Sequence, residues 1–404
     1  MLPILNIFLR FINKKNLVLI LNEFLLSIIF YLTYFYYNLT FVFIISIISF
    51  IAFLLFYNTK DYRNNAILLS FLTFGAFIAF YKESIISIVL GLELVSFSTF
   101  LLFLINNNII ETNTKYFLLS SFSIASLLFG LLLASSNLSI EIALFGSLIA
   151  FFGISFESGI FPLNIFLPNI YKGLRSILIS ILGSFNKLIF IFVLIQLVSF
   201  VFLYNVKILL YLEIASVITM FYGNILALKE KNLKKLIAYS SIAQMGYVII
   251  GLVAYNNIGY IGSIIQAFSY SLSIFALVIL LLVLERENRY SLNDIKSLYY
   301  RNPFLGFVIA IALISLLGIP PTFGFDGKLF LLLSILISGN LILAIIFILN
   351  IVISAYYYLN MLRLVFEEDS KKTTLLYKNE YLVLFIIAFL LILLGLLPNI
   401  IIKI

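Results

Sequence analysis

Residues 309–337 read IAIALISLLGIPPTFGFDGKLFLLLSILI, and this stretch indicates the kind of fold. Its two apolar arms together are long enough to cross a bilayer, which requires about 20 residues. Between the arms, a Gly-Ile-Pro-Pro segment interrupts the helix and is followed by Asp326 and Lys328. Because proline has no backbone N–H, the two prolines free the carbonyls of Leu316 and Leu317. Freed backbone is tolerated at membrane depth only inside protein or beside a water-filled cavity.

Composition extends this interpretation to the whole chain. Of its 404 residues, 64% are hydrophobic and 10% are charged, whereas soluble domains have about 25% charged residues. Cysteine, histidine and tryptophan are absent, which excludes thiolate chemistry and His- or Cys-ligated metal and haem sites in this chain. We therefore predict an all-α polytopic membrane protein with no soluble domain, no bound cofactor and no metal.

Clusters of Asn, Lys, Glu and Pro divide the chain into thirteen expected spans, namely 17–37, 39–57, 66–81, 85–105, 115–135, 139–161, 176–198, 206–228, 235–254, 258–284, 303–337, 341–365 and 379–400. Residues 2–12 are apolar but too short to cross, and no small-residue cleavage site follows them. An interfacial helix fits this segment better than a span or a cleaved signal.

The positive charges are distributed very unevenly between the two sides of these spans. All but five of the 25 lysines and arginines fall on the side of the N-terminus. The positive-inside rule therefore predicts an odd number of spans, with the N-terminus in the cytoplasm or matrix and the C-terminus opposite. We expect an energy-coupling membrane, either a prokaryotic cell membrane, which we prefer, or the mitochondrial inner membrane. This distribution explains the net charge of +8 without a nucleic-acid partner.

A second interrupted helix contains Gly-Ile-Phe-Pro at 159–162, followed by Pro168 and Gly173. Interrupted helices in corresponding positions of two halves indicate an inverted-repeat transporter and its ion site. Five spans separate the two breaks, so they should run in opposite directions in two inverted five-helix repeats. The alternative is that Pro and Gly are simply frequent in membrane helices. The expected division of the chain is an N-terminal part with an interfacial helix and two peripheral spans, two antiporter-like repeats, and a C-terminal loop with the last span, at 1–65, 66–205, 206–365 and 366–404.

Four ionisable residues lie inside otherwise apolar spans: Glu93, Glu157, Lys187 and Lys328. Each costs at least ~2.5–3.5 kcal/mol at mid-bilayer, so such residues commonly serve proton or ion transfer. A lysine suits a relay because burial and a neighbouring carboxylate act on its charge in opposite directions. The alternative for each is a buried ion pair that only fixes packing.

Three further residues are candidates for the relay. Asp326 lies two residues before Lys328 and could be its counter-ion or sit in the unwound segment. Lys115 and Lys235 lie near the ends of their spans. The basic run around Lys235 is also explained as a topology signal.

Four motifs resemble a known family when they are taken together and in this order: GLELVS at 91–96, PNIYKG at 168–173, LKKLIAYSSIAQMGY at 233–247 and GIPPTFGFDGK at 318–328. They are similar to the signatures of the proton-translocating antiporter-like subunits of respiratory complex I. The resemblance covers about residues 60–400. The run FSYSLS at 268–273 is polar but uncharged, as in the N-type subunit (subunit 2), where the L- and M-type subunits have histidine and lysine.

The resemblance also implies roles for single residues. Glu93 matches the glutamate of the first half-channel, Lys187 the central lysine and Lys328 the lysine of the second half-channel. The family usually has a lysine where this chain has Glu157. Glu93 and Glu157 would then hold about one proton between them. Either Lys187 alone compensates this pair, or this half of the relay runs on carboxylates.

Two more positions depart from the family pattern, because Asn164 and Gln244 replace usual histidines. Even so, the resemblance implies a proton-translocating subunit of a quinone oxidoreductase complex. M-type and K-type subunits would be its neighbours, and flavin, iron–sulfur clusters and quinone would belong to or lie between other subunits. The alternatives are a subunit of a cation/proton antiporter or membrane-bound hydrogenase, and a non-conducting scaffold.

Overall fold

The computed structural model describes residues 39–80, 84–136, 139–200, 206–368 and 374–398. These residues form a bundle of long helices, and their one β-type contact is an isolated bridge between Asn232 and Ser291. The helices of the bundle are α3 (Leu39–Phe56), α4 (Tyr62–Phe80), α5 (Ile85–Asn106), α6 (Ile110–Ala134), α7 (Ile140–Ser158), α8 (Leu167–Gly173), α9 (Ser176–Ser180), α10 (Lys187–Phe200), α11 (Val206–Lys229), α12 (Leu233–Val253), α13 (Asn257–Arg286), α15 (Pro303–Leu317), α16 (Phe323–Ile337), α17 (Leu341–Phe366) and α18 (Lys378–Leu396). Short segments complete the described chain: η1 (Leu163–Phe166), η2 (Ile181–Asn186), η4 (Leu292–Ile295) and α14 (Leu298–Arg301).

Both predicted interruptions are present in the structure. The first separates α7 from η1 and α8, and the second separates α15 from α16. The span expected at 176–198 consists of α9, the π-helical segment η2 and α10. Within the described residues, ten helices are long and apolar enough to cross a membrane. The span expected at 17–37 lies outside these residues, so the number thirteen stays a prediction.

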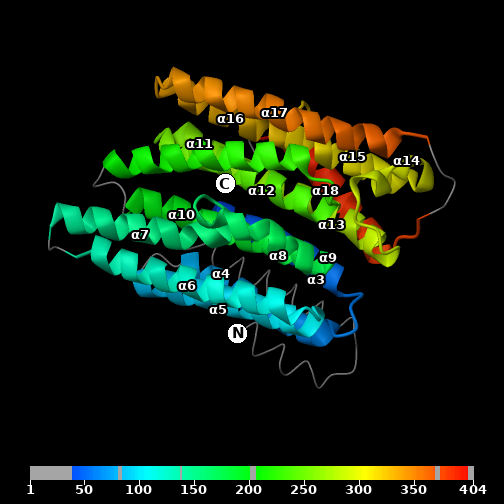
Figure 1. Cartoon of the computed structure of the whole chain (residues 1–404), viewed down its shortest axis with the longest axis horizontal. Helices are drawn as coiled ribbons and strands as arrows, with labels where there is room; N and C mark the ends of the chain where they lie inside the picture. Colours follow the sequence, from blue (N-terminus) through cyan, green and yellow to red (C-terminus); the bar gives the residue numbers. More distant parts are fainter. Residues whose placement is uncertain (1–38, 81–83, 137–138, 201–205, 369–373, 399–404) are drawn as a thin grey trace.

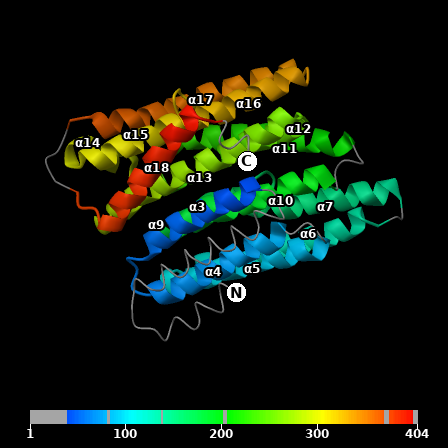
Figure 2. The same ribbon diagram turned by 180° about the vertical axis from the view of Figure 1, so that it is seen from behind.

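The two broken helices run in opposite directions. In Figure 1, α7 and α8 run from left to right, whereas α15 and α16 run from right to left; Figure 2 shows the same arrangement from behind. Within 62–200 the broken helix follows α4, α5 and α6 and precedes the span formed by α9, η2 and α10. Within 206–366 the broken helix likewise follows α11, α12 and α13 and precedes α17. The predicted pair of inverted five-helix repeats is therefore confirmed. In contrast to the two broken helices, α13, which contains 268–273, is continuous from Asn257 to Arg286.

Neighbouring helices approach closely at small residues. A Cβ added to Gly130 on α6 would collide with the backbone of Ala150 on α7, and one added to Gly91 on α5 would collide with that of Ala79 on α4. Small residues at such crossings are how membrane helices gain van der Waals contact, because lipid provides no hydrophobic drive for association.

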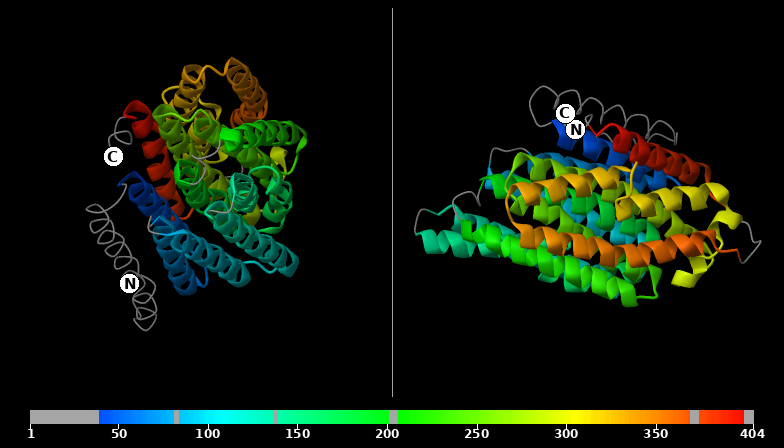
Figure 3. Two further views of the ribbon diagram at one scale, coloured as in Figure 1. Left: turned by 90° about the vertical axis from the view of Figure 1, so that its left-hand side faces the viewer. Right: turned by 90° about the horizontal axis from the view of Figure 1, so that it is seen from above.

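Central helices carry the polar residues. The most apolar part of the span Ser176–Val198 is entirely buried by the rest of the chain, and α12 and α13 are nearly as well covered. In α6 and α18 only a third of the corresponding part is buried. Seen along the helices, the green helices lie between the orange pair α16 and α17 and the blue and cyan helices (Figure 3). This burial shields the centre of the chain from lipid and allows polar side chains to lie there.

Candidate functional site

Lys187 lies at the first break. It is the first residue of α10 and follows the π-helical turn of η2, a feature that often marks functional sites. The side chain is fully buried, and its Nζ donates a hydrogen bond to Ser241 Oγ at 2.6 Å. A Cβ added to Gly159, which has φ +75°, would lie 2.8 Å from this Nζ. The end of α7 therefore lies against the lysine amine, and glycine leaves room for it.

Lys328 lies at the second break in a different way. Its Nζ donates hydrogen bonds to the carbonyl oxygens of Leu316 at 2.7 Å and Leu317 at 2.8 Å. These are the carbonyls that the two prolines were predicted to free. A Cβ added to Gly318, which has φ +81°, would lie 2.6 Å from Lys328 Cδ. The lysine thus satisfies the broken end of the helix that carries it.

Helix α12 connects the two lysines. Gln244 lies one turn after Ser241, the partner of Lys187, and its Nε2 lies 3.2 Å from Leu316 O, which also accepts from Lys328. Gln266 on α13 donates to Gln244 Oε1 at 2.7 Å. A line of polar atoms therefore runs from the first break to the second through the middle of the bundle.

Glu157 extends this line into the first repeat. Its carboxylate is buried and accepts hydrogen bonds from Ser120, from Tyr116 OH at 3.5 Å and from Ser96 at 3.5 Å. Asn186, directly before Lys187, donates to Tyr116 OH at 3.4 Å. Glu157 faces the protein interior, and a hydrogen-bonded chain leads from it to the segment that carries Lys187.

The lysines are not paired with carboxylates. Within the described part of the chain, no carboxylate oxygen lies within 4.0 Å of Lys187 or Lys328. Instead, their Nζ atoms lie 5.9 Å from the Tyr270 ring and 5.3 Å from the Tyr247 ring, respectively, within the range of cation–π attraction. Among the described residues, therefore, neither lysine is held in a buried ion pair with a carboxylate, which was the alternative to a relay.

Glu93 occupies a different environment. It is exposed on the outer face of α5, in line with Ile86, Leu90 and Phe97, which are 62%, 60% and 51% exposed. Ser96, one turn further along α5, reaches Glu157 from the inner side. Glu93 thus lies beside the polar line, at the surface of this chain.

The other candidates are dispersed. Asp326 is buried in the first turn of α16, and its Oδ2 has no hydrogen-bond partner among the described residues. Lys115 is exposed at the start of α6 and pairs with Glu111. Lys235 is half-buried near the start of α12. Lys115 and Lys235 lie at the ends of their helices and are not joined to the polar line by any hydrogen bond that the described residues make.

Sequence reasoning missed several polar residues of the site. Tyrosine and serine are common in membrane helices, so only the contacts in the structure show that Tyr116, Ser120 and Ser241 belong to the site. Tyr358, the last of three consecutive tyrosines, accepts a hydrogen bond from Gln244 Nε2 at 3.2 Å through its hydroxyl oxygen. Asn164 is fully buried, and neither side-chain polar atom finds a partner in the described residues. Its replacement of a family histidine was the one available signal.

The chain resembles known proteins in sequence. Residues 83–354 match the family described as NADH:quinone oxidoreductase/Mrp antiporter, transmembrane. The chain is 34% identical over 241 residues to NADH-quinone oxidoreductase subunit N 2 of Solidesulfovibrio magneticus, covering 59% of this chain and 51% of that protein. It is 25% identical over 376 residues to subunit N of Hydrogenovibrio crunogenus, covering 84% and 77%.

Solved structures share the fold. A chain of respiratory complex I from Thermus thermophilus superimposes with a TM-score of 0.84 at 20% identity, covering 100% of this chain and 97% of that one. A chain of the Mrp complex from Dietzia gives 0.79 at 14% identity, covering 90% and 80%. At these identities the likeness concerns the fold alone.

The fold, together with the line of polar atoms between the two lysines, defines a multi-pass membrane protein of the antiporter-like type. The chain belongs to the NADH:quinone oxidoreductase/Mrp antiporter transmembrane family, and several of the relatives that it matches are named subunit N or subunit 2. It spans about half the length of several of these relatives, for example 51% and 44%.

Proposed function

We propose that this chain translocates protons as an N-type subunit of a quinone-reducing membrane complex. The observation that carries the proposal is the polar line that joins two buried lysines, each lying against a helix break. Lys187 lies against Gly159, and Lys328 binds the freed carbonyls of its own helix. Sites of this kind at interrupted helices are where membrane transporters bind ions.

In this proposal a proton moves along the line in steps. Glu157 accepts a proton through the hydroxyls of Ser120 and Tyr116, which can both donate and accept. Lys187 receives it in the centre, and Ser241 and Gln244 lead towards Lys328. Where hydrogen bonds are interrupted, water would bridge the polar groups, as at Asn164, whose amide lacks protein partners among the described residues.

In this proposal, Glu93 lies at the contact between this chain and a neighbouring membrane subunit. A carboxylate facing lipid costs at least ~2.5–3.5 kcal/mol, so the outer face of α5 is better explained by contact with another membrane subunit. The relatives' names place them in multi-subunit complexes. In such an assembly Glu93 would connect the polar line to the neighbouring subunit. Redox cofactors would belong to other subunits.

Substituting the lysines tests the proposal. Lys187→Met and Lys328→Met keep the side-chain volume and remove the charge, and Lys229→Met, at the exposed end of α11, is the matched control. In vesicles containing the whole complex, we expect each buried substitution to reduce proton translocation by about two orders of magnitude, with the control unchanged. Full translocation in both variants, with the complex intact, would support a non-conducting scaffold instead.

The assembly itself can be identified by its subunits. A quinone-binding or hydrogenase-type subunit that co-purifies with this chain distinguishes the redox-driven complexes from a cation/proton antiporter. The Mrp chain shares the fold, so fold likeness alone does not separate these classes. The same preparation would show on which side of the membrane each terminus lies.

A further inference from the structure

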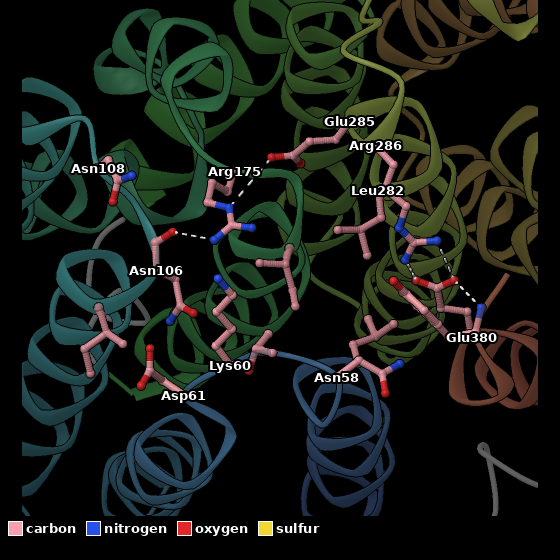
Figure 4. A pocket seen from close by; sticks show the side chains of 15 residues that line it. Asn58, Lys60, Asp61, Asn106, Asn108, Arg175, Leu282, Glu285, Arg286 and Glu380 are labelled. Atoms are coloured by element: carbon pink, nitrogen blue, oxygen red, sulfur yellow. Dashed lines mark hydrogen bonds and ion pairs between the residues drawn. The ribbon is translucent and has the colours of Figure 1, made fainter. Parts of the chain in front are cut away.

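A cavity of about 560 Å³ opens at one end of the bundle, and its lining includes neither Lys187 nor Lys328. It lies between the α3–α4 connection, the end of α5, the α8–α9 turn, the end of α13 and the start of α18 (Figure 4). The lining is partly charged and partly apolar. This combination of charged and apolar residues lies where several helices begin or end.

Most of the charges in this cavity already have partners. Arg286 contacts both carboxylate oxygens of Glu380 and lies 4.2 Å from the Tyr377 ring. Glu285 accepts a hydrogen bond from the backbone N of Ser176 at 2.7 Å. These groups are neutralised or engaged within the protein, and they do not define a ligand.

Lys60 and Arg175 are the more exposed cations of this cavity. Arg175 donates to the carbonyl of Asn106 at 3.2 Å and lies 3.8 Å from a Glu285 oxygen, but more than half of its side chain is exposed. Figure 4 shows the Lys60 ammonium directed towards the Arg175 guanidinium, with the Asp61 carboxylate turned away. Two cations that converge repel one another. An anion between them would turn this repulsion into attraction.

Part of the wall beside these cations is apolar, although most of the lining is polar or charged. Leu55, Ile105, Ile177 and Leu282 line the cavity beside the charged groups. An adjoining cavity of about 290 Å³ shares Arg175 and Glu285 and adds Lys172 and Lys234. The ligand that fits is therefore amphiphilic, with a negative head and apolar tails.

We propose that this cavity binds an anionic phospholipid. Lys60 and Arg175 hold its phosphate, and an acyl chain lies along the apolar wall. Basic pockets between membrane helices on the cytoplasmic or matrix side bind such headgroups, and the charged end of this bundle is the side that carries the basic loops. The site is separate from proton transfer, and it would fix the relative position of α5, α9, α13 and α18.

Lipid retention tests the site directly. The whole complex is purified with wild-type chain, with Lys60→Gln, with Lys60→Gln/Arg175→Gln, and with the control Lys229→Gln/Lys231→Gln, which removes two cations at the same end outside the cavity. Phosphatidylglycerol bound per complex is then measured by mass spectrometry after exchange into nanodiscs of phosphatidylglycerol or of phosphatidylcholine.

We expect wild type and control to retain one more phosphatidylglycerol than the double variant, and each removed cation to weaken retention about fivefold. Phosphatidylcholine should not replace it. Equal retention in all variants would overturn the proposal, and so would an equal loss in the control, since this would indicate general attraction to a basic end.

A second arm separates the lipid from free phosphate. Inorganic phosphate at millimolar concentration is added to delipidated complex, and thermal stability is compared with that after addition of phosphatidylglycerol. We expect stabilisation by the lipid only, and its absence in Lys60→Gln/Arg175→Gln. Stabilisation by inorganic phosphate alone to the same extent would show a simple anion site and overturn the assignment to lipid. Lys60 is exposed in the segment that connects α3 and α4, so Lys60→Gln should fold normally. The single variant therefore still tests the proposal if the double variant fails to fold.

Discussion

Two helix breaks with nearly the same sequence hold their lysines by different means. At 159–162 the chain reads Gly-Ile-Phe-Pro and at 318–321 Gly-Ile-Pro-Pro, and both glycines have positive φ. Lys328 comes from the helix that is broken and binds its backbone carbonyls. Lys187 comes from a different helix and binds a serine hydroxyl on a third one.

The chemical partners explain what this difference means. Backbone carbonyls only accept hydrogen bonds, so they suit an ammonium group, which only donates. A serine hydroxyl can donate as well as accept, and Ser241 does both, because it donates to Ala238 O at 2.8 Å and accepts from Lys187. The comparison indicates that Lys187 depends on one side-chain hydroxyl of another helix, whereas Lys328 is held by two backbone carbonyls at the break in its own helix.

The largest effect should come from Glu157, which has no counterpart at the second break, where Leu316 occupies the matching position. Glu157→Gln keeps hydrogen-bonding capacity but cannot ionise. We expect proton translocation in vesicles to fall by about two orders of magnitude. Glu141→Gln, an exposed position at the start of the same helix, is the control. Unchanged translocation in Glu157→Gln would show that the first break does not need a titratable carboxylate.

The glycines test whether both breaks are shaped around lysine. Gly159→Ala and Gly318→Ala impose strain at positive φ of ~1–3 kcal/mol and also press on a lysine. Gly339→Ala is the control, because its φ is +78° but nothing lies within 4 Å of an added Cβ. We expect thermal denaturation to show a larger loss of stability at both breaks than at Gly339. Equal losses of thermal stability at the three positions would show that backbone strain alone accounts for the effect and that contact with a lysine adds nothing.

Ser241→Ala probes the side-chain partner that only Lys187 has. Losing this hydrogen bond should cost ~1–3 kcal/mol and reduce proton translocation roughly tenfold, less than loss of the lysine itself. Ser180→Ala is matched, because its buried hydroxyl donates only within its own helix. If both serine variants translocate alike, the hydroxyl does not support Lys187.

The smallest effect is expected at Lys115. Its pairing with Glu111 is exposed and lies on one helix face, and such pairs contribute about 0–1 kcal/mol. Lys115→Gln should leave translocation within about twofold of wild type and should not add to the effect of Lys187→Met. A strong effect of Lys115→Gln would extend the functional path to the end of α6.

Several features of the site could be read from the chain. The freed carbonyls at the second break could be predicted from the positions of the two prolines, because a proline lacks the N–H that would bond the carbonyl four residues earlier. Glu157 was singled out as a buried carboxylate beside the first break. Glu93 illustrates the limit: the sequence placed it at mid-span, but helix orientation turned it to the outer face of α5. An isolated charge in an apolar run does not reveal which face the neighbouring helices cover.

The sequence by itself determined the class of fold and the positions of the two helix breaks. Hydrophobic length and helix breakers are local properties that a bilayer translates directly into spans. Only the tertiary structure decided that Ser241 and Gln244 join the two lysines, and that Lys60 and Arg175 converge on one cavity. Those contacts connect residues far apart in the chain, and they depend on how α12 and the α8–α9 turn pack against other helices.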